Sequence, residues 1–198
     1  VQLLVLSSTG PINPLGKKFM EHDDDSIAGP IIRILQLPSG QRTALVRNQC
    51  LTTPFSIILP SICDTLDISH NNISIWPKWP RAGSQPTQFQ YIKTLILSHN
   101  SLHHFDAPLR NTFPSLTGLS IRRTSIEKLS ELKYGIRGLR SLRCLDICET
   151  PLWESCGDAT EQHGMIAELS SSCKALQVIS GVRITLSHRR QVSSSAPS

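Results

Sequence analysis

The stretches Cys-Asp-Thr-Leu-Asp-Ile-Ser-His-Asn-Asn-Ile at 63–73 and Ile-Lys-Thr-Leu-Ile-Leu-Ser-His-Asn-Ser-Leu at 92–102 decide the fold. In each, apolar residues alternate with other residues over a few positions, and an asparagine follows. The alternation predicts a short strand with one side buried and the other side exposed. The asparagine is expected where the strand ends, because its amide can bond backbone groups that a turn leaves unpaired. Asn71 and Asn100 lie 29 residues apart, so each copy contains one strand and one return segment.

Both stretches match the leucine-rich repeat, L-x-x-L-x-L-x-x-N-x-L. Further copies follow at 116–126 and 142–152, where Thr124 and Thr150 take the asparagine position. A threonine hydroxyl is expected to serve part of the same hydrogen-bonding role. Degenerate copies begin at Thr43 and Cys173 and bring the total to about six, which exceeds the minimum of roughly three for a stable array. The sequence therefore predicts an α/β fold, a leucine-rich-repeat solenoid of about six repeats with a parallel concave sheet.

The chain is expected to divide into three parts. Residues 1–40 contain many prolines and glycines around an acidic run and are expected to form a loose N-terminal arm. Within that arm, Ile31–Leu35 has the composition to add an edge strand. Residues 41–186 form the leucine-rich-repeat domain. Residues 187–198 are basic and then rich in serine, and are expected to form a disordered tail.

Two inserts interrupt the repeats. The first, 74–90, contains Trp76 and Trp79, which either cover the outside of the solenoid or anchor a partner. In the second, between Trp153 and Ser172, the apolar residues have helical spacing. We expect this stretch to form a C-terminal capping helix that closes the open end of the core.

The cysteines favour reduced thiols over a disulfide framework. Three fall on inward repeat positions, where cysteine behaves as a small buried hydrophobe: Cys50, Cys63 and Cys173. Cys144 and Cys148 lie on one predicted strand, roughly 13 Å apart, which is too far for a bond between them. Cys148 and Cys156 remain an alternative pair.

Sequence motifs give little support to catalysis or membrane insertion. No run approaches the roughly 18 apolar residues of a membrane span, and the apolar start at 1–6 is too short for a signal peptide, so we expect an intracellular protein. His70 and His99 occupy equivalent repeat positions and are expected to stack, but no further ligand stands beside them at metal-binding spacing. Phosphate-binding loops and nucleophile motifs are also missing. We therefore expect no enzyme, no metal and no cofactor.

The net charge of +5 is concentrated after residue 105. Basic residues there outnumber acidic ones: Arg110, Arg122, Arg123, Lys128, Lys133, Arg137, Arg140 and Arg143. Such a surface suits RNA phosphates or an acidic protein, or it is simply a solvated face. Arg122 is the most informative of these residues, because it occupies the outward strand position equivalent to Ser69 and Ser98.

The order of the repeats resembles one family. The successive segments 64–73, 92–102, 113–121 and 139–147 are similar to those of the A-prime protein of the spliceosomal U-two small nuclear ribonucleoprotein. The resemblance covers residues 43–180. The chain departs from the family pattern at Thr150-Pro151, where family members have Asn-Pro, and it lacks their Tyr-Arg pair in the terminal helix. Related solenoids of phosphatase regulators and axonemal dynein light chains share many of these motifs, so a regulatory or cytoskeletal scaffold remains the alternative.

The resemblance implies a nuclear, non-enzymatic adaptor in pre-mRNA splicing. In that family the concave face grips a helix of an RNA-recognition-motif protein, the B-double-prime subunit, and the pair binds small nuclear RNA. Carried onto this chain, the partner-binding set is Arg47, Asp67, Ser69, His70, Ile96, Ser98, His99, Ser120, Arg122, Arg123, Asp146 and Cys148. Ile96 would offer the apolar contact in the middle of this set.

Overall fold

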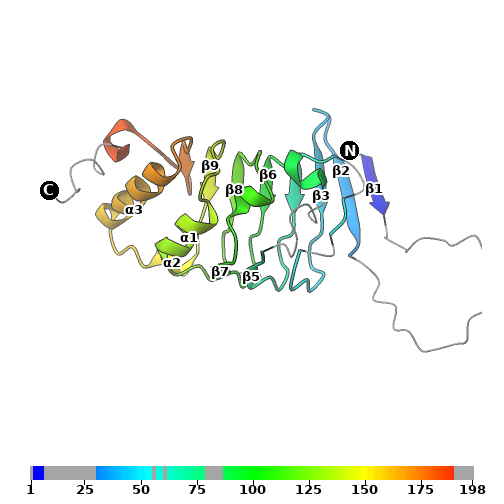
Figure 1. The fold of residues 1–198 in the computed structure, drawn as a ribbon, viewed down its shortest axis with the longest axis horizontal. Coiled ribbons are helices and arrows are strands. Elements are labelled where there is room, and N and C mark those ends of the chain that lie inside the picture. The colour runs from blue at the N-terminus through cyan, green and yellow to red at the C-terminus, as the bar shows by residue number, and fades with distance from the viewer. Residues whose placement is uncertain (1, 7–29, 55–56, 60–61, 79–86, 190–198) are drawn as a thin grey trace, which may run out of the picture.

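A single curved row of strands forms the body of the molecule. The computed structural model describes residues 2–6, 30–54, 57–59, 62–78 and 87–189. Its main sheet has nine strands in the order β1-β2-β3-β4-β6-β8-β9-β10-β11 (Figure 1). The bounds are β1 Gln2–Leu6, β2 Ile32–Gln36, β3 Arg42–Leu45, β4 Thr65–Asp67, β6 Thr94–Ile96, β8 Gly118–Ser120, β9 Cys144–Asp146, β10 Val178–Ile179 and β11 Val182–Arg183.

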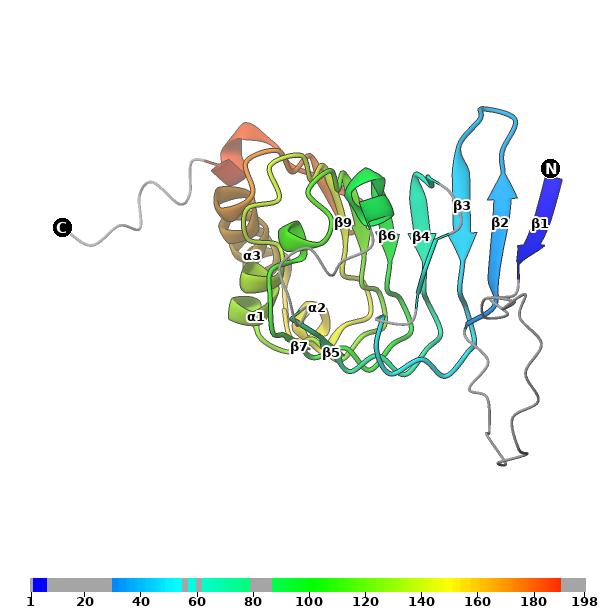
Figure 2. The same cartoon turned by 45° about the vertical axis from the view of Figure 1, so that its right-hand side comes forward.

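The strands from β3 to β10 are parallel, and each pairs with the next one in the row. Figure 2 shows them side by side, with the helices on the other side of the core. The return segments form a two-stranded sheet, two 3₁₀ helices and three α-helices: β5 Ile75–Trp76, β7 His104–Phe105, η1 Thr87–Tyr91, η2 Leu109–Asn111, α1 Leu129–Gly135, α2 Pro151–Glu154 and α3 Ala159–Ser172. This arrangement confirms the predicted leucine-rich-repeat solenoid and its parallel sheet.

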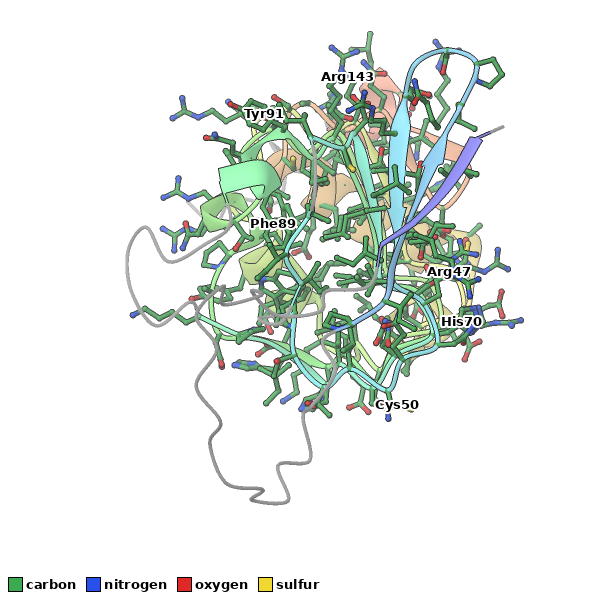
Figure 3. The ribbon with its side chains drawn as sticks, turned by 90° about the vertical axis from the view of Figure 1, so that its right-hand side faces the viewer. Arg47, Cys50, His70, Phe89, Tyr91 and Arg143 are labelled. Carbon is green, nitrogen blue, oxygen red and sulfur yellow. The ribbon has the colours of Figure 1, made fainter. Side chains whose placement is uncertain are left out.

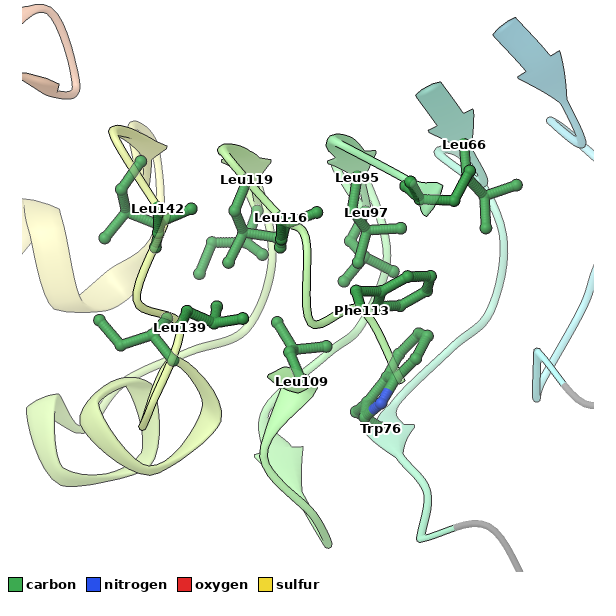
Figure 4. Close-up of a cluster of buried hydrophobic side chains, with 14 of the residues drawn as sticks. Leu66, Trp76, Leu95, Leu97, Leu109, Phe113, Leu116, Leu119, Leu139 and Leu142 are labelled. Atoms are coloured by element: carbon green, nitrogen blue, oxygen red, sulfur yellow. The ribbon is translucent and has the colours of Figure 1, made fainter. Parts of the chain in front are cut away.

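One inward position of each of the strands β4, β6, β8 and β9 contributes to a ladder of leucines in the core. Leu66, Leu95, Leu119 and Leu145 are partners in the sheet register and are at most 3% exposed. Figure 4 shows several of these leucines in a row above the apolar residues of the return segments. Because each three-residue strand buries so few side chains, a single repeat cannot hold its own core, and stability comes from stacking.

The asparagine position supports the turns as its chemistry predicts. The Asn71 amide nitrogen donates to Val46 O at 2.8 Å and to Ile68 O at 2.9 Å. Its oxygen accepts from the backbone N–H of Gln49 at 3.0 Å. Thr124 is too short to bond the neighbouring repeat as Asn71 does. Its hydroxyl donates to Ile121 O at 2.7 Å, within its own repeat. The prediction that threonine serves part of this role is confirmed.

Helix α3 closes the C-terminal end of the core (Figure 1). Asp158 caps it by accepting from the backbone N–H groups of Thr160 and Glu161, and Glu161 bonds back to the N–H of Gly157. These bonds satisfy donors that the first turn leaves open. The buried face carries Met165, Ile166, Ala167, Leu169 and Ser170. The predicted capping helix is confirmed.

Trp76 belongs to the core. Its side chain is fully buried, and its ring centroid lies 5.6 Å from that of Phe113 (Figure 4). Of the two roles open to it, packing is the one observed. Trp79 lies outside the described residues.

Cysteine burial follows the repeat pattern at two of three positions. Cys63 and Cys173 are buried, as predicted. The prediction for Cys50 is wrong, because its side chain is exposed. The chain adopts positive φ at both Asn48 and Cys50, so this degenerate turn does not follow the backbone path of the later repeats. No disulfide joins the cysteines within the described residues.

Parts of both terminal segments have a defined structure that the sequence analysis did not expect. The edge strand expected at 31–35 is observed as β2, which pairs antiparallel with β3 and with β1. The strands β1 and β2 differ from the loose arm expected for residues 1–40, while 7–29 lie outside the described residues. In the tail, His188 is buried and Arg189 donates to Leu176 O, so these two residues are ordered, unlike the disordered tail expected for 187–198. Residues 190–198 lie outside the described residues.

Candidate functional site on the concave face

The outward face of the parallel strands, here called the concave face, is the candidate site. The residue pairs of the sheet place Asp67, Ile96, Ser120 and Asp146 side by side on four neighbouring strands. The next outward position of each repeat follows two residues later along the chain. The chain then turns away at one more position, whose backbone conformation is unusual.

That turning position has positive φ in five consecutive repeats. The residues are Asn48, His70, His99, Arg123 and Glu149, with φ between 53° and 57°. Asparagine and histidine are among the side chains that tolerate this left-handed region best. Since the position recurs at the same point of each repeat, its side chains form one column along the edge of the concave face.

His70 and His99 stack within this column. Their ring centroids are 4.0 Å apart and their planes differ by 13°, which confirms the stacking predicted from their repeat positions. Burial lowers the pKa of His99 below its ordinary value, and the neighbouring His70 adds to that effect. The neutral form of His99 is therefore favoured.

Glu149 binds two arginines at the C-terminal part of the column. Its carboxylate accepts hydrogen bonds from both Arg122 and Arg123. The two guanidinium groups lower the pKa of Glu149, and Glu149 raises the pKa of Arg122. This pairing leaves one net positive charge at a place where the sequence alone suggested two.

Smaller polar groups form the floor of the face. The Ser98 and Ser120 hydroxyl oxygens are 2.8 Å apart, and Ser120 also donates to Asp146 at 3.3 Å. Asp67 accepts from the hydroxyl of Ser69 at 2.7 Å and bonds the guanidinium of Arg47. These bonds fix the side chains across neighbouring repeats, so the floor is pre-organised for a partner.

The structure places nine of the twelve predicted contact residues at exposed or half-buried positions. The other three are buried: Asp67, Ser69 and Ser98 are 1%, 3% and 8% exposed. We expected these three side chains to be exposed. They are buried because they are small or, for Asp67, ion-paired, and larger neighbouring side chains cover them. Figure 3 shows Arg47 and His70 at the right of the view, below Tyr91 and Arg143, which lie toward the top.

Several residues of the face were missed by the sequence analysis: Asn48 and Glu149 in the column, and Thr65, Thr94, Gly118 and Cys144 at the first outward position of the strands. Glu149 occupies the repeat position of His70 and His99, so an alignment of the repeats carried the signal for it. Cys144 is exposed and pairs with Gly118, which places it on the concave face beside Asp146. Burial raises the pKa of the Cys148 thiol two residues farther on. Cys144 is therefore the more accessible of the two thiols on this face.

The described residues contain no group of three His, Cys, Asp or Glu side chains arranged to hold a metal ion. Among the same residues, no helix combines the length and apolar character needed to cross a membrane. What the concave face does present is a pre-formed polar surface around a half-buried isoleucine, Ile96.

Comparison with known proteins supports the fold. The sequence matches no protein-family model and no curated protein. A chain of the crystal structure of the Drosophila melanogaster SNF/U2A' complex is similar with a TM-score of 0.61 and 16% sequence identity, over 81% of this chain and 86% of that chain. A chain of the Chaetomium Mex67:Mtr2 structure has a TM-score of 0.38 and 17% identity, over 60% and 77% of the two chains. The protein thus has a leucine-rich-repeat fold that resembles a chain of the SNF/U2A' complex.

Proposed function

We propose that the protein is a non-enzymatic adaptor in pre-mRNA splicing that acts in the nucleus. Its concave face would hold a helix of an RNA-recognition-motif protein of the B-double-prime type, and the pair would bind small nuclear RNA. The observation that carries this proposal is the likeness over most of both chains to a protein solved in complex with SNF. The order of the repeats in the sequence also resembles the A-prime family.

The dimensions of the sheet suit a helical partner. Six parallel strands spaced about 4.8 Å apart span roughly 24 Å. A helix laid across them would use about 16 residues at 1.5 Å each. Since a helix is about 10 Å wide, it would cover the outward side chains of the strands and reach the column at their ends.

The chemistry of the face indicates where such a helix makes contact. Ile96 is half-buried between buried Asp67 and half-buried Ser120, so an apolar side chain of the partner can pack on it. Arg47 and Arg122 flank this centre, and their side chains are each 48% exposed. Asp67 neutralises Arg47, whereas Glu149 leaves one net positive charge on Arg122 and Arg123. An amphipathic helix with an apolar anchor and an acidic residue toward Arg122 matches this arrangement.

Binding of Drosophila SNF provides the test. The affinity of SNF should be measured by isothermal titration calorimetry for the wild type, Ile96→Glu, Arg122→Glu and Lys128→Glu. Ile96→Glu should weaken binding by about 30-fold or more, because it places a charge at the apolar centre of the contact. Arg122→Glu should weaken binding less and mainly slow association.

Lys128→Glu is the matched control. Lys128 is exposed at the N-terminal cap of α1, away from the sheet, so its reversal should change the affinity little. Thermal melting of each variant checks that the fold is intact. Absence of SNF binding to the wild type would contradict the proposed partner, and loss of binding only in Lys128→Glu would place the partner on another surface.

A further inference from the structure

The second surface of interest is the edge of the sheet at which the parallel strands begin, here called the strand-start edge. It comprises the described residues of the segments 37–42, 57–64, 87–93, 109–117, 136–143 and 173–177, which lead into the strands. Backbone bonds link these segments in one line, since Thr117 N bonds Lys93 O and Arg143 N bonds Thr117 O. The concave-face proposal does not use this edge.

The structure shows which basic residues form ion pairs and which lie on the strand-start edge. Arg122 and Arg123 are paired with Glu149, and Lys133 is paired with Glu168. The strand-start edge, in contrast, carries seven exposed cations: Arg42, Lys93, Arg110, Arg137, Arg140, Arg143 and Lys174. Asp64 is the only acidic residue among the described residues of these segments, and it pairs with Lys93 at 2.9 Å.

Acidic residues gather instead where the strands end. The described segments that follow the strands, 46–54, 68–78, 97–108, 121–135 and 147–172, contain eight acidic residues: Asp106, Glu127, Glu131, Glu149, Glu154, Asp158, Glu161 and Glu168. They also contain six cations: Arg47, Lys78, Arg122, Arg123, Lys128 and Lys133. By formal charge the strand-start segments carry +6 (seven cations and one acid), whereas the segments that follow the strands carry −2 (six cations and eight acids). Such a separation focuses an electrostatic field on the basic edge and attracts a polyanion to it.

Two arginines of this edge line a surface hollow. A hollow of about 360 Å³ is lined by Arg110, Asn111, Pro114, Gly138 and Arg140. Gly138 has a φ of +77°, a conformation that favours glycine, and the Arg110 side chain packs over it, with Cδ 2.5 Å from where a Cβ would lie. Guanidinium groups around a hollow suit phosphate oxygens, which they bind with two parallel hydrogen bonds.

Tyr91 adds an aromatic ring to the same edge. It ends η1, two residues before Lys93, and is 47% exposed. Figure 3 shows Tyr91 and Arg143 at the same end of the molecule, away from His70. An exposed ring beside cations favours a nucleic acid over an acidic protein, because a base can stack on the ring while the cations bind phosphates.

We propose that the strand-start edge binds a single-stranded nucleic acid, with the arginines on its phosphates and Tyr91 against a base. Backbone bonds join Lys93, Thr117, Arg143 and Gln177 in succession across neighbouring segments, so Lys93 and Gln177 are three strand spacings apart, or about 14 Å. A stacked single strand, with the rise of about 3.4 Å per nucleotide that it has in a duplex, places about four nucleotides over that length. The interaction is carried by backbone charge and stacking, so it has little sequence preference.

Fluorescence anisotropy with labelled 12-nucleotide RNA and DNA of the same mixed sequence tests this. With about four phosphate contacts, the logarithm of the binding constant should fall with the logarithm of salt at a slope near −3, or about 50-fold from 50 to 200 mM salt. Tyr91→Ala should weaken binding by about fivefold or more, and Tyr91→Phe should not.

A charge-matched pair of double variants separates this edge from the rest of the surface. Arg140→Glu with Arg143→Glu should weaken binding more than about tenfold and flatten the salt slope. Lys78→Glu with Lys128→Glu changes the net charge equally outside the strand-start segments and should have a much smaller effect. Thermal melting checks that all variants are folded.

Three results would overturn the proposal. They are the absence of binding to either oligonucleotide at 50 mM salt, equal losses in the two double variants, and tighter binding of a 16-residue polyglutamate peptide than of RNA and DNA. The last result would assign the edge to an acidic protein. Because SNF is not used here, these outcomes are independent of those that test the concave face.

Discussion

The asparagine position allows the stacking of repeats to be tested with one substitution. Asn100 uses its amide across two repeats: Nδ2 donates to Leu97 O at 2.8 Å and to Ile68 O at 3.1 Å, while Oδ1 accepts from Ile73 N at 3.0 Å. Asn100→Thr would leave a hydroxyl there, as the chain itself has at Thr124. The hydroxyl would keep only the bond within its own repeat.

The cost of Asn100→Thr follows from the partners that are left behind. Ile68 O would still accept from Asn71, but the N–H of Ile73, a fully buried residue, would lose its acceptor. A buried donor without a partner costs about 1–3 kcal/mol. We therefore expect the free energy of unfolding to fall by about 2 kcal/mol in Asn100→Thr and by more in Asn100→Ala.

Urea unfolding followed by far-ultraviolet circular dichroism measures these differences. Thr124→Ala is the comparison, since it removes one bond within a repeat and should cost about 1 kcal/mol. Thr124→Ser keeps the hydroxyl and should cost less than Thr124→Ala. A loss below about 0.5 kcal/mol in Asn100→Thr would refute the reasoning, because the bonds between repeats would then contribute little.

Two further predictions concern the core and the histidine column. Leu95 is fully buried in the centre of its ladder, so Leu95→Asp should unfold the domain, and a cooperative thermal melt close to that of the wild type would disprove the repeat register. Burial lowers the pKa of His99 in the folded protein, so the stability that its neutral form contributes is present above the ordinary pKa of 6.5 and is lost as the pH falls below that value. The urea midpoint should therefore drop less between pH 7.5 and pH 5.5 in His99→Gln than in the wild type.

The repeat residues predict the fold because their side chains act locally. The alternation around Leu66 and Leu95 gives both the strands and their register, and equivalent positions predict the stack of His70 on His99. Burial of Asp67, Ser69 and Ser98 was not predictable in this way. It depends on neighbours from other repeats, such as Arg47 above Asp67 and Ser120 beside Ser98.

Charge was the least predictable feature. The sequence gives the number of cations after residue 105, but the pairing of Arg122 and Arg123 with Glu149 depends on a turn at the same repeat position. The division into a basic and an acidic edge likewise depends on which segments lead into strands and which leave them. Both features appear only when the strands are stacked.

The labelling rate of native cysteines tests the central claim, that the concave face receives the partner. Cys144 is exposed on that face, whereas Cys50 is exposed in the turn after β3, away from the outward strand positions. The rates at which a maleimide modifies these two thiols should be measured by peptide mass spectrometry with and without saturating SNF. The account predicts that SNF slows labelling of Cys144 by about tenfold or more, as expected for a thiol covered by a bound helix, and leaves Cys50 unchanged. Equal labelling of Cys144 in the presence and absence of SNF would contradict it.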